Sequence, residues 1–278
     1  MKKILVPFDF SVASSWGFYY AHDLAASIGA ELMVMHLYLP HSETTVLEDY
    51  QTPDQEDVHT RREQIAMHLE AATQLPIGKQ NSTVKVSYIV DYGERKEIAN
   101  YAKLHKADLI IMGTTGATST VRNIVGTNTV GVLDEANCPV LVVPEGAKFQ
   151  KNMAIAYATD LTTSDVDYLT TLAKIAELTD SKIHCVHVNK FSGSVNRVAE
   201  DTFKKLLKDR ITNVNVSFTS WSAMDVAEGL EVFCRINNIS LLSVLKHTQT
   251  TWEKIFGEKS MTKTLALKKN IPLLAFRD

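Results

Sequence analysis

The sequence has few cysteines, no long apolar run and almost no net charge. Its three cysteines, Cys138, Cys185 and Cys234, are widely spaced and form no CxxC pair, which predicts buried free thiols in a reducing cytoplasm. No apolar run is long enough to span a bilayer, and the N-terminal apolar stretch is too short for a signal peptide. A net charge of −3 argues against a dedicated nucleic-acid-binding or membrane-surface protein.

What is present is typical of a soluble globular protein with a real core. The chain has 278 residues, of which 45% are hydrophobic and 22% charged. This length suits one large domain or two of ordinary size.

The chain contains an internal repeat. The opening KKILVPFDFSVAS is answered by KNMAIAYATDLTTS, so that Asp9 corresponds to Asp160, and His36 has its counterpart in His187, 151 residues later. Further along, KADLIIMG corresponds to NISLLSVL, and NCPVLVVPE corresponds to NIPLLAFRD. We therefore predict two tandem domains, residues 1–146 (the first unit) and residues 151–278 (the second unit).

Each unit alternates short apolar strands with amphipathic helices. KILVPF, ADLIIMG and CPVLVVP are almost wholly apolar, as parallel strands buried on both faces are, and Gly29 is placed to end the first helix. The pattern predicts an α/β protein with two doubly wound parallel sheets. Ligands of such sheets bind beyond the carboxyl ends of the strands, where the strand order reverses.

One stretch at such a strand end is rich in glycine. Residues 110–129 read IIMGTTGATSTVRNIVGTNT, with Gly113, Gly116, Gly126 and Thr127 after or near the ends of predicted elements. Glycines let backbone N–H groups approach an anion, and a following helix N-terminus favours phosphate. Neither GxxxxGK[ST] nor GxGxxG is present, so spacing alone leaves open a phosphate loop or a plain turn.

The spacing Gly113-x2-Gly116-x9-Gly126-Thr127 resembles the nucleotide-binding signature of the universal stress protein family. KKILVPFDFSVAS, VMHLY, DLIIMGTTG and CPVLVVP resemble that family in the same order. The resemblance covers nearly the whole first unit and, more faintly, the second. It implies a tandem universal stress protein with an adenine nucleotide α-hydrolase-like (Rossmann-like) fold. Members often bind ATP, generally form dimers, and are linked to stress resistance.

The resemblance also implies a set of ligand-binding residues. Asp9 would accept hydrogen bonds from the ribose or the adenine, although as a residue just before a helix it is also a candidate N-cap. The loop departs from many ATP-binding members in lacking a basic residue just after its first glycine, and Arg122 is its one cation. The whole implied set is Pro7, Asp9, Leu37, Met112, Gly113, Gly116, Gly126, Thr127 and Asn128.

The second unit has lost this motif. Aligned on Gly126 and Gly257, it places Val244 at the position of Gly113, and it has His247 and Glu258 in place of Gly116 and Thr127. A β-branched side chain blocks close backbone approach and a carboxylate repels phosphate. We expect this unit not to bind ATP in the same mode.

Other candidate sites have simpler interpretations. In HCVH, His187 repeats His36, which favours a packing role over a zinc site. The acidic segment 43–57 is expected to be a solvated loop, and TRREQIAMHLE a charged helix face. No catalytic or metal-binding residues are predicted.

The leading hypothesis is a cytoplasmic stress-response sensor or regulator that binds ATP, ADP or AMP, alone or with Mg²⁺, in its first unit. The alternatives are a slow ATPase or related enzyme, and an interaction scaffold without a nucleotide. CPVLVVP and IPLLAFRD are expected to pair within one chain as a pseudo-dimer, and a further homodimer is an additional expectation. No nucleic-acid or membrane partner is expected.

Overall fold

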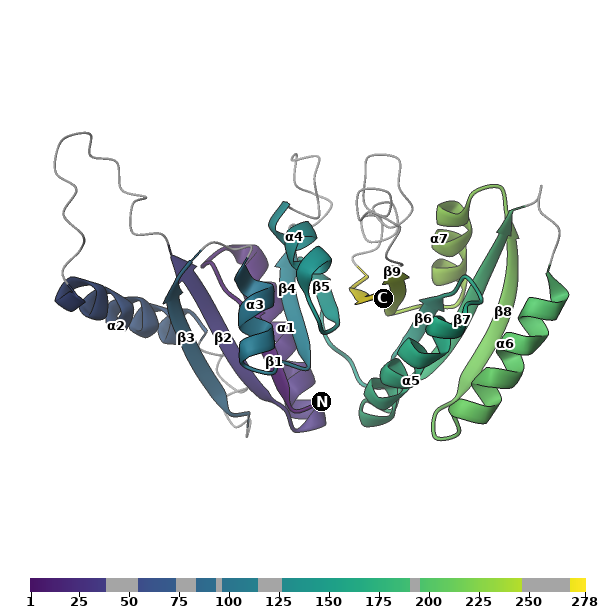
Figure 1. Ribbon diagram of the computed structural model, residues 1–278, viewed down its shortest axis with the longest axis horizontal. Helices are drawn as coiled ribbons and strands as arrows, with labels where there is room; N and C mark the ends of the chain where they lie inside the picture. Colours follow the sequence, from purple (N-terminus) through teal and green to yellow (C-terminus); the bar gives the residue numbers. More distant parts are fainter. Residues whose placement is uncertain (39–54, 74–83, 94–96, 115–126, 191–195, 247–270) are drawn as a thin grey trace.

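The computed structural model describes residues 1–38, 55–73, 84–93, 97–114, 127–190, 196–246 and 271–278. Strands and helices alternate along both units (Figure 1). In the first unit they are β1 (Lys3–Pro7), α1 (Val12–Ile28), β2 (Glu31–Tyr38), α2 (Gln55–Ala72), β3 (Val86–Tyr92), α3 (Ile98–Leu104), β4 (Leu109–Thr114), α4 (Thr127–Glu135) and β5 (Val140–Pro144). In the second unit they are β6 (Ala154–Ala158), α5 (Thr163–Leu178), β7 (Lys182–Lys190), α6 (Arg197–Arg210), β8 (Val216–Ala223), α7 (Val226–Ile236), β9 (Leu241–Lys246) and β10 (Leu273–Arg277).

The described strands form a single sheet of ten, in the order β3-β2-β1-β4-β5-β10-β9-β6-β7-β8. Within each unit every neighbouring pair is parallel, which confirms the predicted α/β doubly wound fold. The units lie side by side and meet at the antiparallel pair β5 and β10, where Val142 faces Leu273 (Figure 1). The predicted pairing of CPVLVVP with IPLLAFRD is therefore confirmed. The boundaries at residues 146 and 151 stay a prediction.

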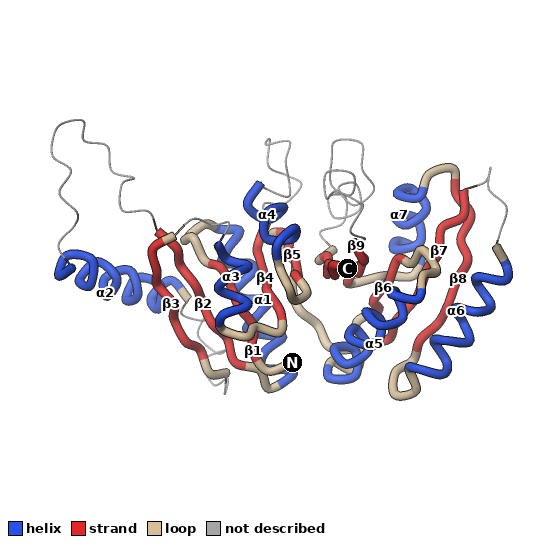
Figure 2. The backbone as a smooth tube through the Cα atoms, viewed as in Figure 1, coloured by secondary structure: helices blue, strands red, loops and turns tan. Residues whose placement is uncertain are grey.

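Apolar residues alternate between the two faces of this sheet and build two cores, with helices on both sides (Figure 2). One core contains side chains of α1, α5 and α6, and the other contains side chains of α3, α4 and α7. Each core includes residues of both units. The seam between the units is thus covered by continuous apolar packing.

The repeat extends to unusual backbone conformations. Phe10 and Leu161 follow the first strand of their units in the left-handed region, with φ of 63° and 62°. Gly29, which ends α1 with a φ of 68° as predicted, has a left-handed counterpart in Asp180, with a φ of 54°. Left-handed backbone is uncommon outside glycine, so its recurrence at equivalent positions shows that the turns of both units share one geometry.

One predicted loop is partly helical. The acidic segment 43–57 was expected to be solvated loop throughout, but α2 already begins at Gln55. Residues 43–54 lie outside the described residues. The sequence carries no helix signal here because Gln55, Glu56 and Asp57 are all polar. Acidic residues occur both in solvated loops and in the first turn of a helix, where the helix dipole favours them.

Candidate functional site

The carboxyl ends of β1, β2 and β4 meet at one edge of the first unit. Strand order reverses here, because the chain leaves β1 toward β2 on one side and β4 lies on the other. This is the position at which open α/β sheets bind ligands. The edge brings together five of the predicted residues: Pro7, Asp9, Leu37, Met112 and Gly113.

The remaining predicted residues belong to the segment between β4 and α4. Gly116 and Gly126 lie outside the described residues. Thr127 and Asn128 are the first two residues of α4, which confirms that the glycine stretch leads into a helix, but their side chains are not among those described.

Asp9 is exposed, two residues beyond the end of β1. Its Oδ1 accepts hydrogen bonds from the Ser11 backbone N–H at 3.2 Å and from the Ser11 hydroxyl at 2.5 Å. The N-cap of α1 is Ser11, whose Oγ accepts from the Ser14 N–H at 3.1 Å. The alternative interpretation of Asp9 as the N-cap is therefore wrong. Asp9 instead presents an anchored carboxylate at the edge.

Phe10 also lies at this edge, although it is not among the predicted residues. It is 43% exposed, and its ring lies 4.9 Å from the ring of His36 and 5.5 Å from that of Phe8. The His36 Nδ1 lies 2.8 Å from the Phe8 carbonyl oxygen, which can only accept, so this nitrogen carries the hydrogen. The sequence signal for Phe10 is an aromatic residue next to Asp9, directly after a predicted strand end, whereas its exposure is seen only in the folded structure.

Gly113 has a structural role that is independent of any ligand. It lies within β4, and a Cβ at this position would overlap the carbonyl oxygen of Ala13 in the first turn of α1. A Cβ on Gly17 would in turn lie 2.6 Å from the Gly113 nitrogen. The pair of glycines lets α1 approach β4 backbone to backbone. Neither a phosphate loop nor a plain turn is needed to explain this first glycine.

The other side of the same edge is apolar. Met112 is buried, and Leu37 packs half-buried against the same core as Met112 and Met35. The edge therefore combines an apolar floor with an exposed carboxylate. A flat heterocycle that carries polar atoms on its rim fits such a surface.

The strand register corrects the alignment of the second unit. Ile4 pairs with Leu109, and its repeat partner Ile155 pairs with Leu241. Counting along β4 and β9, the counterpart of Gly113 is Leu245, so the prediction of Val244 was wrong. Because neighbouring strand residues point to opposite faces, the error of one residue had placed the side chain on the wrong side of the sheet.

The counterpart of Gly17 is Tyr168, at the same position in α5 as Gly17 in α1. The second unit therefore has a tyrosine and a leucine where the first has two glycines. The Tyr168 hydroxyl donates to the Arg277 carbonyl oxygen at 2.6 Å, and its ring packs 5.5 Å from that of Phe276. The close approach of helix and strand seen in the first unit cannot form here with these side chains.

A buried carboxylate fixes the turn after β6. Asp165 is 1% exposed and accepts hydrogen bonds from the hydroxyls of Tyr157 at 2.8 Å and Thr159 at 2.9 Å. It also accepts from the Thr162 N–H at 3.0 Å, which completes a capping box at the start of α5. Burial and the charge of Asp165 raise the pKa of Tyr157. In the first unit Ser14 stands in place of Asp165, so this network belongs to the second unit.

The histidines of HCVH have structural partners. His187 Nδ1 lies 2.7 Å from the Thr159 carbonyl oxygen, which repeats the His36 contact and confirms the packing role. His184 Nδ1 lies 2.9 Å from the Ser217 hydroxyl. Cys185 is buried, and this burial raises the pKa of its thiol. Among the described side chains, no group of three or more His, Cys, Asp or Glu residues could hold a metal ion.

The cysteines are free thiols, as predicted. Cys185 and Cys234 are buried, whereas Cys138 is only half-buried. Burial and the neighbouring charge of Asp108 raise the pKa of Cys138 to about 12, which disfavours the reactive thiolate form.

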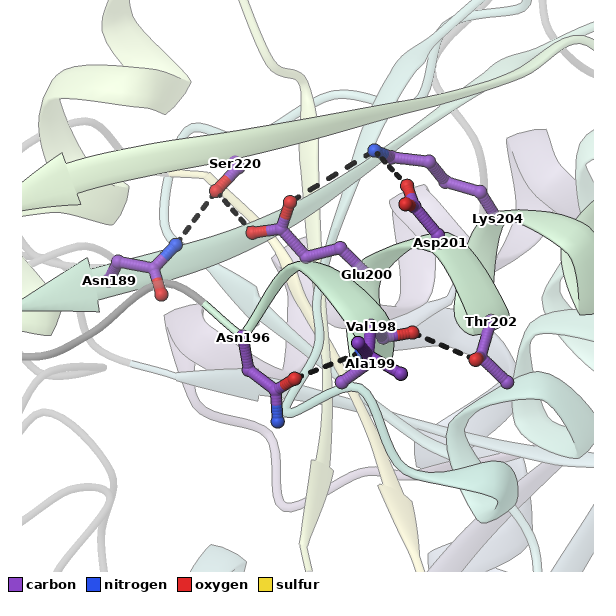
Figure 3. Close-up of polar contacts among 9 residues, drawn as sticks. All are labelled: Asn189, Asn196, Val198, Ala199, Glu200, Asp201, Thr202, Lys204 and Ser220. Atoms are coloured by element: carbon purple, nitrogen blue, oxygen red, sulfur yellow. Dashed lines mark hydrogen bonds and ion pairs between the residues drawn. The ribbon is translucent and has the colours of Figure 1, made fainter.

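The second unit has one more polar cluster, between α6 and the strands β7 and β8 (Figure 3). The Asn189 amide donates to the Ser220 hydroxyl at 2.7 Å, and Ser220 donates to the buried carboxylate of Glu200 at 2.6 Å. Lys204 lies 4.0 Å from Glu200 and 5.1 Å from the centre of the Phe218 ring. Through these contacts Glu200 links α6 to the sheet, which is a structural role.

Comparison with known proteins identifies the family. The model of the universal stress protein family matches residues 1–144, slightly more than half of the chain. The chain belongs to the universal stress protein family. This agrees with the fold. None of the helices within the described residues is long and apolar enough to cross a membrane.

The relatives cover different shares of the chain. A universal stress protein of Methanocaldococcus jannaschii is 48% identical over 52 residues, which cover 19% of this chain and 31% of the relative. This chain thus matches only about a third of that relative's length. A solved universal stress protein from Archaeoglobus fulgidus has the same fold over 99% of this chain and 98% of its own, with a TM-score of 0.71 and 16% identity. Another, solved in complex with cAMP, matches 52% of this chain and 98% of its own at a TM-score of 0.37 and 18% identity.

Proposed function

We propose that the first unit binds an adenine nucleotide and that the protein acts as a cytoplasmic sensor or regulator of the stress response. The observation that carries the proposal is the position of Asp9, an exposed carboxylate at the reversal of strand order, in a chain whose sequence carries the family's glycine motif.

Each part of a nucleotide has a suitable partner at this edge. Met112 and Leu37 supply an apolar surface for the base, and Pro7 closes the end of β1 beside them. The Asp9 carboxylate is suited to accept from a ribose hydroxyl or an adenine amino group. The N-terminus of α4, which begins at Thr127, is suited to the phosphates because its N–H groups and its dipole both favour an anion.

The second unit does not bind nucleotide in this way. Asp160 is exposed like Asp9, but Tyr168 and Leu245 replace the two glycines. We propose that this unit completes the sheet through β10 and leaves the chain with one nucleotide site. We also expect the whole chain to form a homodimer. Light scattering tests this by measuring whether the molar mass in solution is twice that of one chain.

A matched pair of variants tests the proposal. Asp9→Asn keeps an acceptor for Ser11 but removes the charge, and Asp160→Asn makes the same change at the equivalent position of the second unit. Titration calorimetry with ATP, ADP and AMP, each with and without Mg²⁺, should give a dissociation constant about tenfold higher for Asp9→Asn. The constant for Asp160→Asn should equal that of the wild type.

The purified protein should also release a nucleotide on denaturation, detected by mass spectrometry, and added nucleotide should raise the melting temperature by a few degrees. No shift with any adenine nucleotide, cAMP included, at millimolar concentration would falsify the proposal and favour a scaffold. Steady phosphate release over many turnovers, lost in Asp9→Asn, would instead support an ATPase.

A further inference from the structure

Helix α4 belongs to the first unit but packs against strands of both units. Its buried residues Val132 and Leu133 belong to the same core as Val142 of β5 and Leu273 of β10. The helix that begins at the proposed phosphate end of the site therefore lies over the seam between the units. Any change in the second unit that shifts α4 also shifts its N-terminus.

The last turn of α4 has an unfavourable charge. It contains Asp134 and Glu135 and no basic residue. The carboxyl end of a helix already carries a partial negative charge, so two carboxylates there repel it. A cation from elsewhere in the fold would offset this repulsion.

Lys246 supplies that cation from the second unit. It is the last residue of β9, its side chain is only 10% exposed, and its Nζ forms an ion pair with Asp134, which is 43% exposed. In the first unit the same strand position holds Thr114, which has no charge. The ion pair is therefore a departure from the repeat, placed where α4 crosses the seam.

We infer that Lys246 is a positioning residue for nucleotide binding, a role that rests on the proposed nucleotide site. By holding the last turn of α4, Lys246 fixes the direction of the helix and hence where its first N–H groups point. Affinity for the phosphates in the first unit then depends on a side chain of the second unit. The base and ribose, which we place at the ends of β1, β2 and β4, do not depend on the direction of α4.

The test compares a ligand with phosphates to one without. Titration calorimetry on the full-length chain should show that Lys246→Met weakens ATP binding about fivefold and leaves adenosine binding unchanged. Asp134→Asn should also weaken ATP binding, and the double variant should bind ATP no more weakly than Lys246→Met, because the ion pair is already lost in that single variant. Lys204→Met, which removes an ion-paired lysine from α6 (Figure 3), is the control and should bind both ligands as the wild type does.

The outcomes separate the two proposals. Unchanged ATP binding by Lys246→Met, or equal weakening of ATP and adenosine, would overturn the role of Lys246 while the nucleotide site stands. Adenosine binding also shows that each variant is folded at the site. A wild-type chain that binds neither ligand would overturn the proposed function and, with it, the positioning role.

Discussion

The two units share one backbone plan but differ in what fills the space between the first helix and the fourth strand. In the first unit Gly17 and Gly113 allow backbone contact, and in the second unit Tyr168 and Leu245 occupy the corresponding positions. The left-handed turns at Phe10 and Leu161 are the same in both. The turn geometry is therefore common to both units, whereas the glycines serve the close packing of α1 on β4 in the first unit alone.

The largest expected effect comes from adding a single methyl group at Gly113. Gly113→Ala places a Cβ against the Ala13 carbonyl, so α1 must move, and we expect a loss of about 3 kcal/mol or more in the free energy of unfolding. Gly131→Ala in α4 is the control, because a Cβ there meets nothing within 4 Å and alanine favours a helix by up to about 1 kcal/mol. Urea denaturation measures both. Equal stability of the two variants would contradict the packing role of Gly113.

The buried network of the second unit should give the next largest effect. Asp165→Asn replaces one accepting oxygen by an amide nitrogen, whose N–H groups then face the donors of Tyr157, Thr159 or Thr162. We expect this change to lower the free energy of unfolding by about 2 kcal/mol. The equivalent change in the first unit, Ser14→Ala, removes a hydroxyl whose Oγ donates to the Ser11 carbonyl, and should cost about 1 kcal/mol or less. Thermal unfolding followed by circular dichroism distinguishes them. If Ser14→Ala proved the more destabilising, the hydrogen bonds of Asp165 would not be what stabilises the turn after β6.

The smallest effect is expected at the ion pairs on the surface. Arg62 of α2 pairs with Asp91 of β3, and Arg210 of α6 pairs with Asp167 of α5 at 3.1 Å. Partial burial acts to raise the pKa of Asp91, but hydrogen bonds from the Tyr101 hydroxyl and the Tyr92 N–H and the charge of Arg62 outweigh it, so the pKa is lowered. Arg62→Met should therefore lower the free energy of unfolding by about 0.5 kcal/mol at pH 7. Arg210→Met should leave it almost unchanged, because the side chains of Arg210 and Asp167 are more exposed than those of Arg62 and Asp91.

The pH dependence of the Arg62→Met effect follows from the sign of that shift. A lowered pKa means that the folded state binds the proton less readily than the unfolded state, so Asp91 contributes stability above the unfolded pKa of about 4. This contribution is lost as the pH falls through the lower, folded value. The difference between wild type and Arg62→Met, measured by urea denaturation, should shrink on acidification, and a growing difference would show that another group pairs with Arg62.

Much of the fold could be predicted from residue patterns alone. The apolar strands, the repeat of Asp9 in Asp160, and the pairing of the last strands are local or pairwise patterns, and all of them recur in the structure. For the same reason the sequence predicts a candidate site at the strand ends, because parallel strands bring their carboxyl ends to one edge. Phe10 was missed because exposure is a property of the folded surface.

The residue patterns were enough to show a repeated α/β fold with an acidic residue after the first strand of each unit and a glycine motif in only one. The folded sheet was required to show that Gly113 corresponds to Leu245, that Gly113 packs on Gly17, and that Lys246 reaches Asp134 across the seam. The physical reason is that side chains alternate across a sheet. An alignment wrong by one residue still matches two apolar strands, yet it puts every side chain on the opposite face, and only the register of the folded sheet resolves the difference.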